Sequence, residues 1–288
     1  MRPRLSNAER ELIKKSIQSA EKPEPATLNH ILDSYAELTS IERQYLRDVV
    51  QQTKPKRILE IGVSHGGSAV VLLDATRDTG ARITSLDYLQ QCYKAPSKQT
   101  GWIVHEMFVD LSDRWTFKGG GVVCQYLEEV SRGEKFDMLF LDTAHQNPGE
   151  FLNILEALPH LDKGAVVVLH DTALYTIDLR CTTNHILLST LKGKRILFDD
   201  PACPNVPNIG GIVLDDPMDR DMLWALFANT ALPWTYTPPF VDCTLLHNYY
   251  LKHYDKRLVN IFDKSVERHY QGLTNGCPVP SGSLNYVA

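Results

Sequence analysis

The sequence lacks several features that mark common classes of protein. It has no apolar run of about 18 residues, which a membrane-spanning helix requires, and no apolar core after Met1 of the kind found in signal peptides. Its 6 cysteines form no C-x-x-C pair, so neither a zinc site nor a disulfide framework is indicated. We therefore expect a cytoplasmic protein with reduced thiols and no membrane partner.

An excess of positive charge is also missing. The chain has 30 Lys and Arg against 35 Asp and Glu, for a net charge of -5. A nucleic-acid binder depends on basic side chains that neutralise phosphates, so we expect no nucleic-acid partner and a small-molecule substrate instead. Internal repeats and low-complexity tracts are absent too, which favours one catalytic domain with helical additions.

Segments with strand and helix patterns alternate through the middle of the chain. The predicted strands are 57–61, 82–87, 102–108, 136–141, 165–169, 195–198 and 211–214. The predicted helices between them are 67–75, 122–131 and 149–158. Such alternation is typical of an α/β fold. We therefore predict a Rossmann-like, doubly wound and mostly parallel sheet made of the seven strands given above.

Helical segments flank this core on both sides, which divides the chain into three parts. Residues 1–54 predict an N-terminal helical segment, where Thr39 and Glu42 have the spacing of a capping box. Residues 55–215 predict the cofactor-binding domain. Residues 216–288 predict a C-terminal helical extension with helices over 218–230 and 244–271.

The second of these C-terminal helices carries an apolar stripe at helical spacing. Its members are Leu251, Tyr254, Leu258, Ile261 and Phe262. Such a stripe most often packs within its own subunit, and less often forms the seam of a homo-oligomer. Both interpretations stay open from the sequence.

The most informative segment is 57–68, an apolar strand that ends in an acid and glycines before a helix. Gly62 and Gly66 permit a tight turn and a close approach of the backbone to a ligand. The order Glu-x-Gly-x-Ser-x-Gly-Gly differs from the G-x-G-x-x-G of dinucleotide sites. Because Glu60 stands at the strand end, a cationic ligand fits better than a pyrophosphate, although a simple tight connection remains an alternative.

Further polar side chains follow three other predicted strands. Asp87 ends the second strand, at the position where an acid accepts hydrogen bonds from a ribose diol. Asp142 and His145 follow the strand 136–141, and His170 and Asp171 follow 165–169. Since the carboxyl ends of parallel strands share one crevice, we expect these groups to converge. Two carboxylates and one imidazole would hold a divalent ion, and the other imidazole would act as a base.

The segment 57–68 resembles motif I of class I S-adenosylmethionine (SAM) methyltransferases. Together with Asp87 and the two acid–histidine pairs, residues 40–215 resemble the branch of sugar O-methyltransferases and cephalosporin-hydroxylase-like proteins. The resemblance implies a SAM-dependent methyltransferase that acts on the hydroxyl of a small molecule or sugar. It also implies that the cofactor pocket is lined by Glu60, Gly62, Ser64, Gly66 and Asp87.

The later motifs resemble those of metal-dependent O-methyltransferases of the catechol and macrolide-sugar type. The resemblance implies a metal at Asp142, His170 and Asp171. Our own hypothesis for catalysis is that His145 or His170 is the base, while Asp142 and Asp171 bind the metal or orient the imidazole and the substrate hydroxyl. The pair His170-Asp171 departs from the acid-acid or acid-asparagine pair of those enzymes, and histidine is a poor magnesium ligand. Magnesium, manganese, iron and the absence of a metal therefore all stay open.

Three alternatives compete with a methyltransferase. Residues 62–66 also match G-x-S-x-G, the nucleophile elbow of serine hydrolases, with Ser64 as the nucleophile. Against it, Glu60 would put negative charge near a developing oxyanion. A non-catalytic protein that binds SAM or a nucleotide is the second alternative, because a fold can persist without its chemistry. The third is an oxygenase-like site with ferrous iron held by His145, His170 and a carboxylate.

Overall fold

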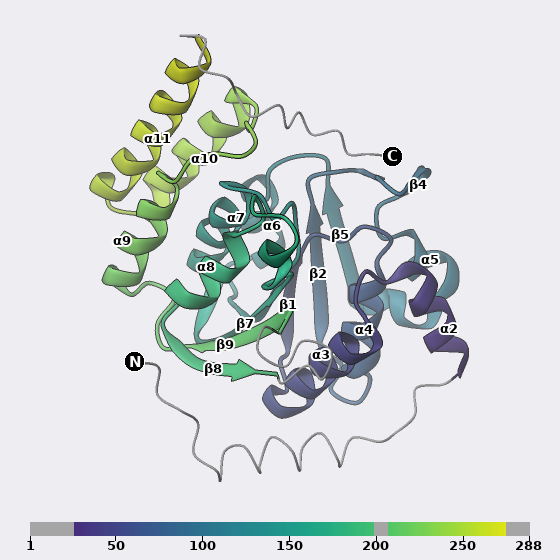
Figure 1. Ribbon diagram of the computed structural model, residues 1–288. Coiled ribbons are helices and arrows are strands. Elements are labelled where there is room, and N and C mark those ends of the chain that lie inside the picture. The colour runs from purple at the N-terminus through teal and green to yellow at the C-terminus, as the bar shows by residue number, and fades with distance from the viewer. Residues whose placement is uncertain (1–25, 199–206, 275–288) are drawn as a thin grey trace.

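A computed structural model describes residues 26–198 and 207–274 of the chain. Its centre is a seven-stranded sheet with the order β5-β2-β1-β6-β7-β9-β8 (Figure 1). The first five strands in this order are parallel, and β9 runs antiparallel to both of its neighbours. In spatial order the strands are β5 (Trp115–Gly119), β2 (Arg82–Asp87), β1 (Arg57–Ile61), β6 (Phe136–Leu141), β7 (Leu161–His170), β9 (Ile209–Leu214) and β8 (Gly193–Leu197). The predicted Rossmann-like, doubly wound sheet is thus confirmed.

The central strands are apolar on both faces, which explains why helices cover both sides. Successive strand residues point to opposite faces. In β6, Leu139 and Leu141 enter one core cluster, whereas Met138 and Phe140 enter the other. A parallel sheet that is buried in this way needs helical layers on each face.

The two helical layers come from different parts of the chain. One face is covered by α2 (Ala26–Tyr35), α3 (Ser40–Thr53), α4 (Gly67–Ala75) and α5 (Trp102–Met107). The other face is covered by α6 (Cys124–Ser131), α7 (Gly149–Ala157), α8 (Thr183–Thr190), α9 (Arg220–Asn229), α10 (Phe240–His253) and α11 (Lys256–Thr274). Figure 1 shows α9, α10 and α11 as a group beside α7 and α8. None of the helices in the described ranges is long and apolar enough to cross a bilayer.

Short elements complete the described chain. The connections contain a small hairpin of β3 (Gln91–Cys92) and β4 (Ala95–Gln99), and the 3-10 turns η1 (Val109–Arg114), η2 (Leu158–His160) and η3 (Leu174–Thr176). Residues 1–25 of the predicted N-terminal helical segment lie outside the described residues.

The predicted capping box at the start of α3 is confirmed. The Glu42 amide donates to Thr39 Oγ1 at 3.3 Å, and the Thr39 amide donates to Glu42 Oε2 at 2.7 Å. The two side chains thus satisfy two amides that a helix start otherwise leaves without partners. This cap fixes the orientation of the Glu42 side chain, whose other carboxylate oxygen faces His170 at the end of β7.

The strand predicted at 102–108 is wrong. That segment forms α5, and the edge strand of the sheet is β5, further along the chain. Ile103 and Val104 are fully buried, and a short apolar run of this kind is equally consistent with a buried strand or a buried helical turn. In β5, Trp115 is buried but Thr116 is exposed, as in an edge strand.

The single helix predicted over 244–271 is also wrong, because the segment forms two helices. Tyr254 adopts an extended backbone conformation after α10. Asp255 then accepts a hydrogen bond from the Arg257 amide at 2.8 Å, which satisfies the first turn of α11. Aspartate competes for nearby amides in this way, and therefore starts helices better than it continues them.

The apolar stripe of these helices packs within the chain. Tyr254, Leu258 and Phe262 are buried in the same core cluster as α7 and α9, while Leu251 is exposed. The intramolecular interpretation of the stripe is thus confirmed for these buried residues. A homo-oligomer formed through the C-terminal helices stays a prediction.

Gly62, directly after β1, leaves no room for a side chain. It has a φ of +92°, and a Cβ at this position would lie 1.7 Å from the carbonyl oxygen of Asp142. The Asp142 amide in turn donates to the Ile61 carbonyl at 2.9 Å. Only glycine allows both this conformation and this contact.

We predict that Gly62→Ala lowers the free energy of unfolding by roughly 3 kcal/mol or more, because it adds a backbone clash to an unfavourable φ. Gly80→Ala is the matched control. Gly80 has a φ of +66°, but nothing lies within 4 Å of the place that a Cβ would occupy, so its cost should be about 1 kcal/mol. Chemical denaturation measures both, and equal costs would contradict the role of the Asp142 contact.

Candidate functional site

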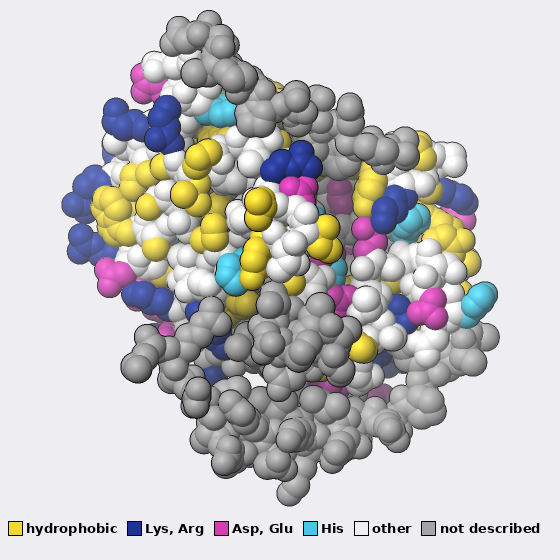
Figure 2. Space-filling view, viewed as in Figure 1, with side chains coloured by type: hydrophobic (Ala, Val, Ile, Leu, Met, Phe, Trp, Pro, Cys, Tyr) yellow, Lys and Arg dark blue, Asp and Glu magenta, His cyan; other side chains and the backbone are white. Residues whose placement is uncertain are grey.

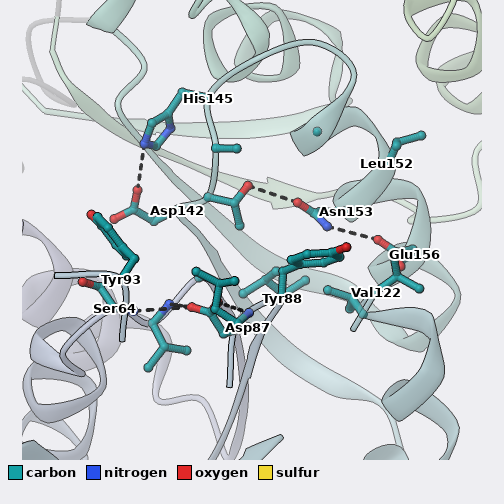
Figure 3. A pocket seen from close by; sticks show the side chains of 18 of the residues that line it. Ser64, Asp87, Tyr88, Tyr93, Val122, Asp142, His145, Leu152, Asn153 and Glu156 are labelled. Carbon is teal, nitrogen blue, oxygen red and sulfur yellow. Dashed lines mark hydrogen bonds and ion pairs between the residues drawn. The ribbon is translucent and has the colours of Figure 1, made fainter. Parts of the chain in front are cut away.

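A cavity of about 660 Å³ opens at the carboxyl ends of the parallel strands. Its wall includes the residues that follow four strands, namely Gly62 after β1, Asp87 at the end of β2, Asp142 after β6 and Asp171 after β7. Figure 3 shows the side chains of Asp87 and Asp142 along this wall. Polar groups from the four strands meet here because the strand ends lie at one edge of the sheet, as ligand sites do in open α/β folds.

Three of the five predicted cofactor residues line the cavity. These are Gly62, Ser64 and Asp87. Gly66 does not line it, because it lies at the start of α4, where a Cβ would meet Gly101 at 3.0 Å. The next residue, Gly67, takes its place in the wall.

Glu60 lies behind the cavity wall and is fully buried. One carboxylate oxygen accepts a hydrogen bond from Ser85, whose hydroxyl also accepts from Trp115 Nε1 at 2.7 Å. Burial raises the pKa of Glu60 to about 7, and the nearby charges of Asp142 and Asp87 act in the same direction. The Glu60 side chain thus joins β1 to Ser85 of β2 and to Ser68 of α4, and does not face the cavity.

Asp87 holds the glycine turn from the neighbouring strand. Its Oδ2 accepts from the Val63 amide at 2.9 Å and its Oδ1 accepts from the Leu89 amide at 2.8 Å. Burial raises the pKa of Asp87, although these amides act against the shift. Each carboxylate oxygen can accept more than one hydrogen bond, so the side chain can still take hydroxyl donors from a ligand.

The Ser64 hydroxyl has no histidine base among the described residues. Its Oγ is buried and faces the side chains of Glu37 and Tyr93, neither of which is an imidazole. A nucleophilic serine needs a histidine or other base within hydrogen-bond reach. The described site therefore gives no support to the serine-hydrolase alternative.

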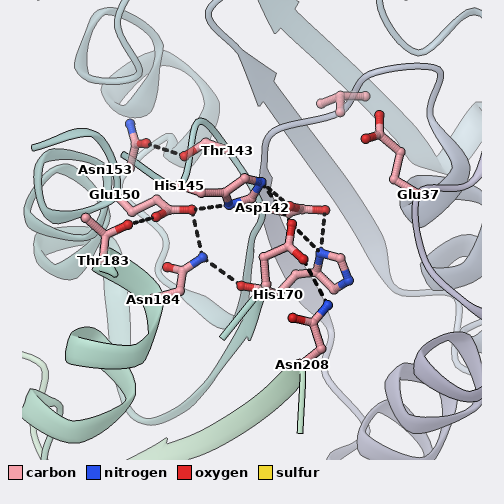
Figure 4. A network of polar contacts seen from close by, with 12 residues as sticks. Glu37, Asp142, Thr143, His145, Glu150, Asn153, His170, Thr183, Asn184 and Asn208 are labelled. Atoms are coloured by element: carbon pink, nitrogen blue, oxygen red, sulfur yellow. Dashed lines mark hydrogen bonds and ion pairs between the residues drawn. The ribbon is translucent and has the colours of Figure 1, made fainter. Parts of the chain in front are cut away.

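His145 lies at the centre of a network of carboxylates (Figure 4). Its Nδ1 lies 2.9 Å from Glu150 Oε1, and its Nε2 lies 3.0 Å from Asp171 Oδ2 and 3.6 Å from Asp142 Oδ1. Burial alone would lower the pKa of His145, but these carboxylates raise it to about 9. The Glu150 contact fixes the ring orientation and leaves Nε2 at the cavity side.

His170 lies deeper, behind the two aspartates, and does not line the cavity. Its Nδ1 lies 3.3 Å from Asp142 Oδ2 and 3.5 Å from Asp171 Oδ2, while its Nε2 lies 3.4 Å from Glu42 Oε1. Burial alone would lower the pKa of His170, but Asp142 and the other two carboxylates hold it well above its usual value. The imidazoles of His170 and His145 lower the pKa of Asp171, although its burial alone would raise it.

Three further residues of the network, Glu42, Glu150 and Asn208, were not predicted as site residues. Glu150 is fully buried and accepts from Thr183 and from Asn184 Nδ2. Asn208 Nδ2 donates to Glu42 Oε1 at 3.0 Å and to Asp171 Oδ1 at 2.9 Å. Only Glu42 carried a sequence signal, and that signal was its helix cap.

The backbone is strained at three residues of the wall. Ser64, His145 and Asp171 have φ values of 52°, 56° and 52°, although none is a glycine. Such conformations cost roughly 1–3 kcal/mol each and persist where the surrounding structure enforces them. Their concentration at one cavity is typical of a functional site.

The predicted metal ligands do come together. One ligand atom from each of Asp142, His170 and Asp171 lies within 4.8 Å of the other two. Neither ring nitrogen of His170 makes a well-formed hydrogen bond to a described residue, although both are buried. Nδ1 of His170 faces one carboxylate oxygen of each aspartate, so the three residues fit a divalent metal, which on binding would take the place of the proton on that imidazole.

Carboxylates dominate the charge of the cavity. None of its lining residues within the described ranges is Lys or Arg, and Figure 2 shows acidic side chains in the hollow of this face. The acidic side chains that line it are Glu37, Asp87, Asp142, Glu156, Asp171 and Asp242. A wall of this kind favours a ligand that carries positive charge.

Residues 59–172 match a family model described as a methyltransferase domain. The matched segment runs from β1 to the residue after Asp171, and thus contains every predicted site residue. No curated protein matches the sequence.

Solved structures of methyltransferases share the fold. A putative O-methyltransferase from Klebsiella pneumoniae has a TM-score of 0.51 at 16% identity, over 71% of this chain and 96% of that one. An O-methyltransferase from Bacillus cereus in complex with SAH has a TM-score of 0.51 at 17% identity, over 70% and 97%. An SAH-bound methyltransferase from Podospora anserina has a TM-score of 0.50 at 16% identity, over 75% and 99%.

We predict that Glu150→Ala lowers the free energy of unfolding by about 3–5 kcal/mol, because it leaves three buried donors without their acceptor. Glu134→Ala is the control, since the Glu134 side chain makes an exposed ion pair with Arg57, and its effect should stay within about 0.5 kcal/mol. Urea denaturation measures both variants. A small effect of Glu150→Ala would mean that the network does not depend on this carboxylate.

Proposed function

We propose that this chain, whose residues 59–172 match a methyltransferase domain, is a class I SAM-dependent enzyme that methylates a hydroxyl oxygen of a small-molecule acceptor, such as a sugar. One observation carries the proposal. Strand-end carboxylates and a histidine held by Glu150 face one cavity beside the glycine turn of β1.

The four free thiols of the described residues support a cytoplasmic location.

The charge of the cavity supports SAM as the cofactor. SAM carries a sulfonium and an ammonium group and no phosphate, so it matches a wall of carboxylates. Gly62 permits a close approach of the ligand at the end of β1, and Asp87 offers acceptors to the ribose hydroxyls. A dinucleotide would instead bring a pyrophosphate next to these acids.

The chemistry is an in-line displacement in which bound SAM supplies an electrophilic methyl group. The protein must align the acceptor oxygen within about 3–3.5 Å of the methyl carbon and take the hydroxyl proton. His145 is the base that we favour, because it lines the cavity and presents Nε2 there. With SAM bound, the neutral form of His145 would accept the hydroxyl proton at Nε2, and because the pKa of His145 is about 9, this form becomes more abundant as the pH rises toward 9.

His170 serves a different purpose in this proposal. Since it lies behind Asp142 and Asp171, it cannot reach an acceptor directly, and it positions the two carboxylates instead. Asp142, His170 and Asp171 would also hold a divalent cation, which would supply Lewis-acid polarisation of the acceptor oxygen when bound. The mixed donor set suits manganese or iron better than magnesium.

Calorimetric titration tests the cofactor and the metal together. We expect SAH to bind the chelated protein, because the glycine turn and Asp87 do not need a metal. In a separate titration, we expect Mn²⁺ to bind the metal-free protein once the chelator is removed, and to raise turnover. We expect Asp171→Asn to weaken Mn²⁺ binding with little effect on SAH binding. Absence of SAH binding in every condition would refute the cofactor, and absence of Mn²⁺ binding would refute the metal alone.

We predict that His145→Ala lowers kcat by roughly 10²–10⁴-fold, the usual contribution of a positioned base. The Kd for SAH should change little, because the variant leaves the glycine turn and Asp87 intact. The matched control is His30→Ala, an exposed histidine of α2 outside the cavity. Steady-state kinetics measures kcat with an acceptor that the wild-type protein methylates. An unchanged kcat would exclude His145 as the base.

A further inference from the structure

The C-terminal extension forms one wall of the cavity, although it lies outside the matched methyltransferase segment. The link between α9 and α10 contributes Tyr236–Pro239 to the wall, and α10 contributes Asp242 and Leu246. These residues lie more than 60 positions beyond residue 172, where the family match ends. The cavity is therefore incomplete without the extension.

Tyrosine side chains anchor α10 to the helix that forms the adjoining wall. The hydroxyl of Tyr249 donates to the Glu156 carbonyl at 2.6 Å, and that of Tyr250 donates to the Leu152 carbonyl at 3.2 Å. Both rings are buried. Because Leu152 and Glu156 also line the cavity, α7 and α10 present a fixed surface to a ligand.

A hydrogen bond between two side chains joins α10 to the residue that follows β2. The hydroxyl of Tyr88, directly after Asp87, donates to Asp242 Oδ2 at 2.9 Å. Asp242 is 8% exposed, whereas Tyr88 retains 44% exposure and lines the cavity. The ring of Tyr88 is therefore held at its tip while much of its surface stays open to a ligand.

The position of Tyr88 indicates which part of a ligand it would meet. In Figure 3 its ring lies beside Asp87, on the side toward Asn153 and Glu156 and away from His145. His145 marks the end where methyl transfer would occur, and Asp87 marks the ribose. The ring thus lies where the adenine of the cofactor would follow the ribose, and aromatic faces bind planar bases by stacking.

We propose that Asp242 is a positioning residue for the cofactor, which holds the ring of Tyr88 against the adenosyl group. This inference rests on the proposed SAM-dependent function. An exposed tyrosine ring would otherwise lose rotational freedom on binding, and pre-ordering removes that cost. The hydrogen bond also ties the extension to the cofactor, so that affinity for SAM depends on a segment outside the methyltransferase domain.

The test compares SAH binding and SAM kinetics among variants of this pair. Asp242→Ala and Tyr88→Phe should each raise the Kd for SAH and the KM for SAM by about three- to tenfold, with kcat at saturating SAM unchanged. Asp242→Asn should restore binding, because its amide oxygen accepts the same hydrogen bond. The double variant Tyr88→Phe/Asp242→Ala should bind no more weakly than Asp242→Ala alone.

Asp263→Ala is the matched control within the extension, since it removes a carboxylate that pairs with His247 away from the cavity. It should leave Kd and KM unchanged. If Asp242→Ala does not fold, Tyr88→Phe carries the test, because it removes only a hydroxyl from a half-exposed side chain. Wild-type affinity in Tyr88→Phe, or equal losses in Asp242→Asn and Asp242→Ala, would overturn the positioning role. Absence of SAH binding to the wild type would instead overturn the proposed function.

Discussion

The arrangement of the site depends on a balance of buried charge. Glu42, Asp142, Glu150 and Asp171 surround the imidazoles of His145 and His170 at the edge of the sheet. Carboxylates buried without cationic partners would destabilise the fold by several kcal/mol each. The imidazoles and the amides of Asn184 and Asn208 provide that compensation. His145 and Asp171, which both take part in this network, also have the strained backbone conformations described above.

The sequence predicts the parallel core of the fold well, since each strand carries its own local signal. The strands 57–61, 82–87 and 136–141 have the predicted bounds. Long apolar runs with an acid or glycine at the end are typical of buried parallel strands. For the same reason the residues at strand ends, among them Asp87, Asp142 and Asp171, could be expected at one cavity.

The remaining parts of the site had no such signal. Glu150 is only five positions after His145, but that spacing across a turn matches no known motif, and Asn208 reaches Asp171 through tertiary packing. The edge strand β5 was misplaced because the buried residues Ile103 and Val104 give a stronger apolar pattern than the alternation of Trp115 and Thr116. Asp242 illustrates the same limit, since its partner Tyr88 is 154 positions away.

The capping box of α3 joins the site to the N-terminal helices. One carboxylate oxygen of Glu42 closes the start of the helix, while the other faces His170 and Asn208. A substitution that suited only the helix would therefore disturb the charge balance around the imidazoles. As a result, α3 cannot be exchanged for the equivalent helix of a distant homologue as an independent module. The residues at its start must change together with the end of β7, so this boundary is a poor place for recombination or for chimera design.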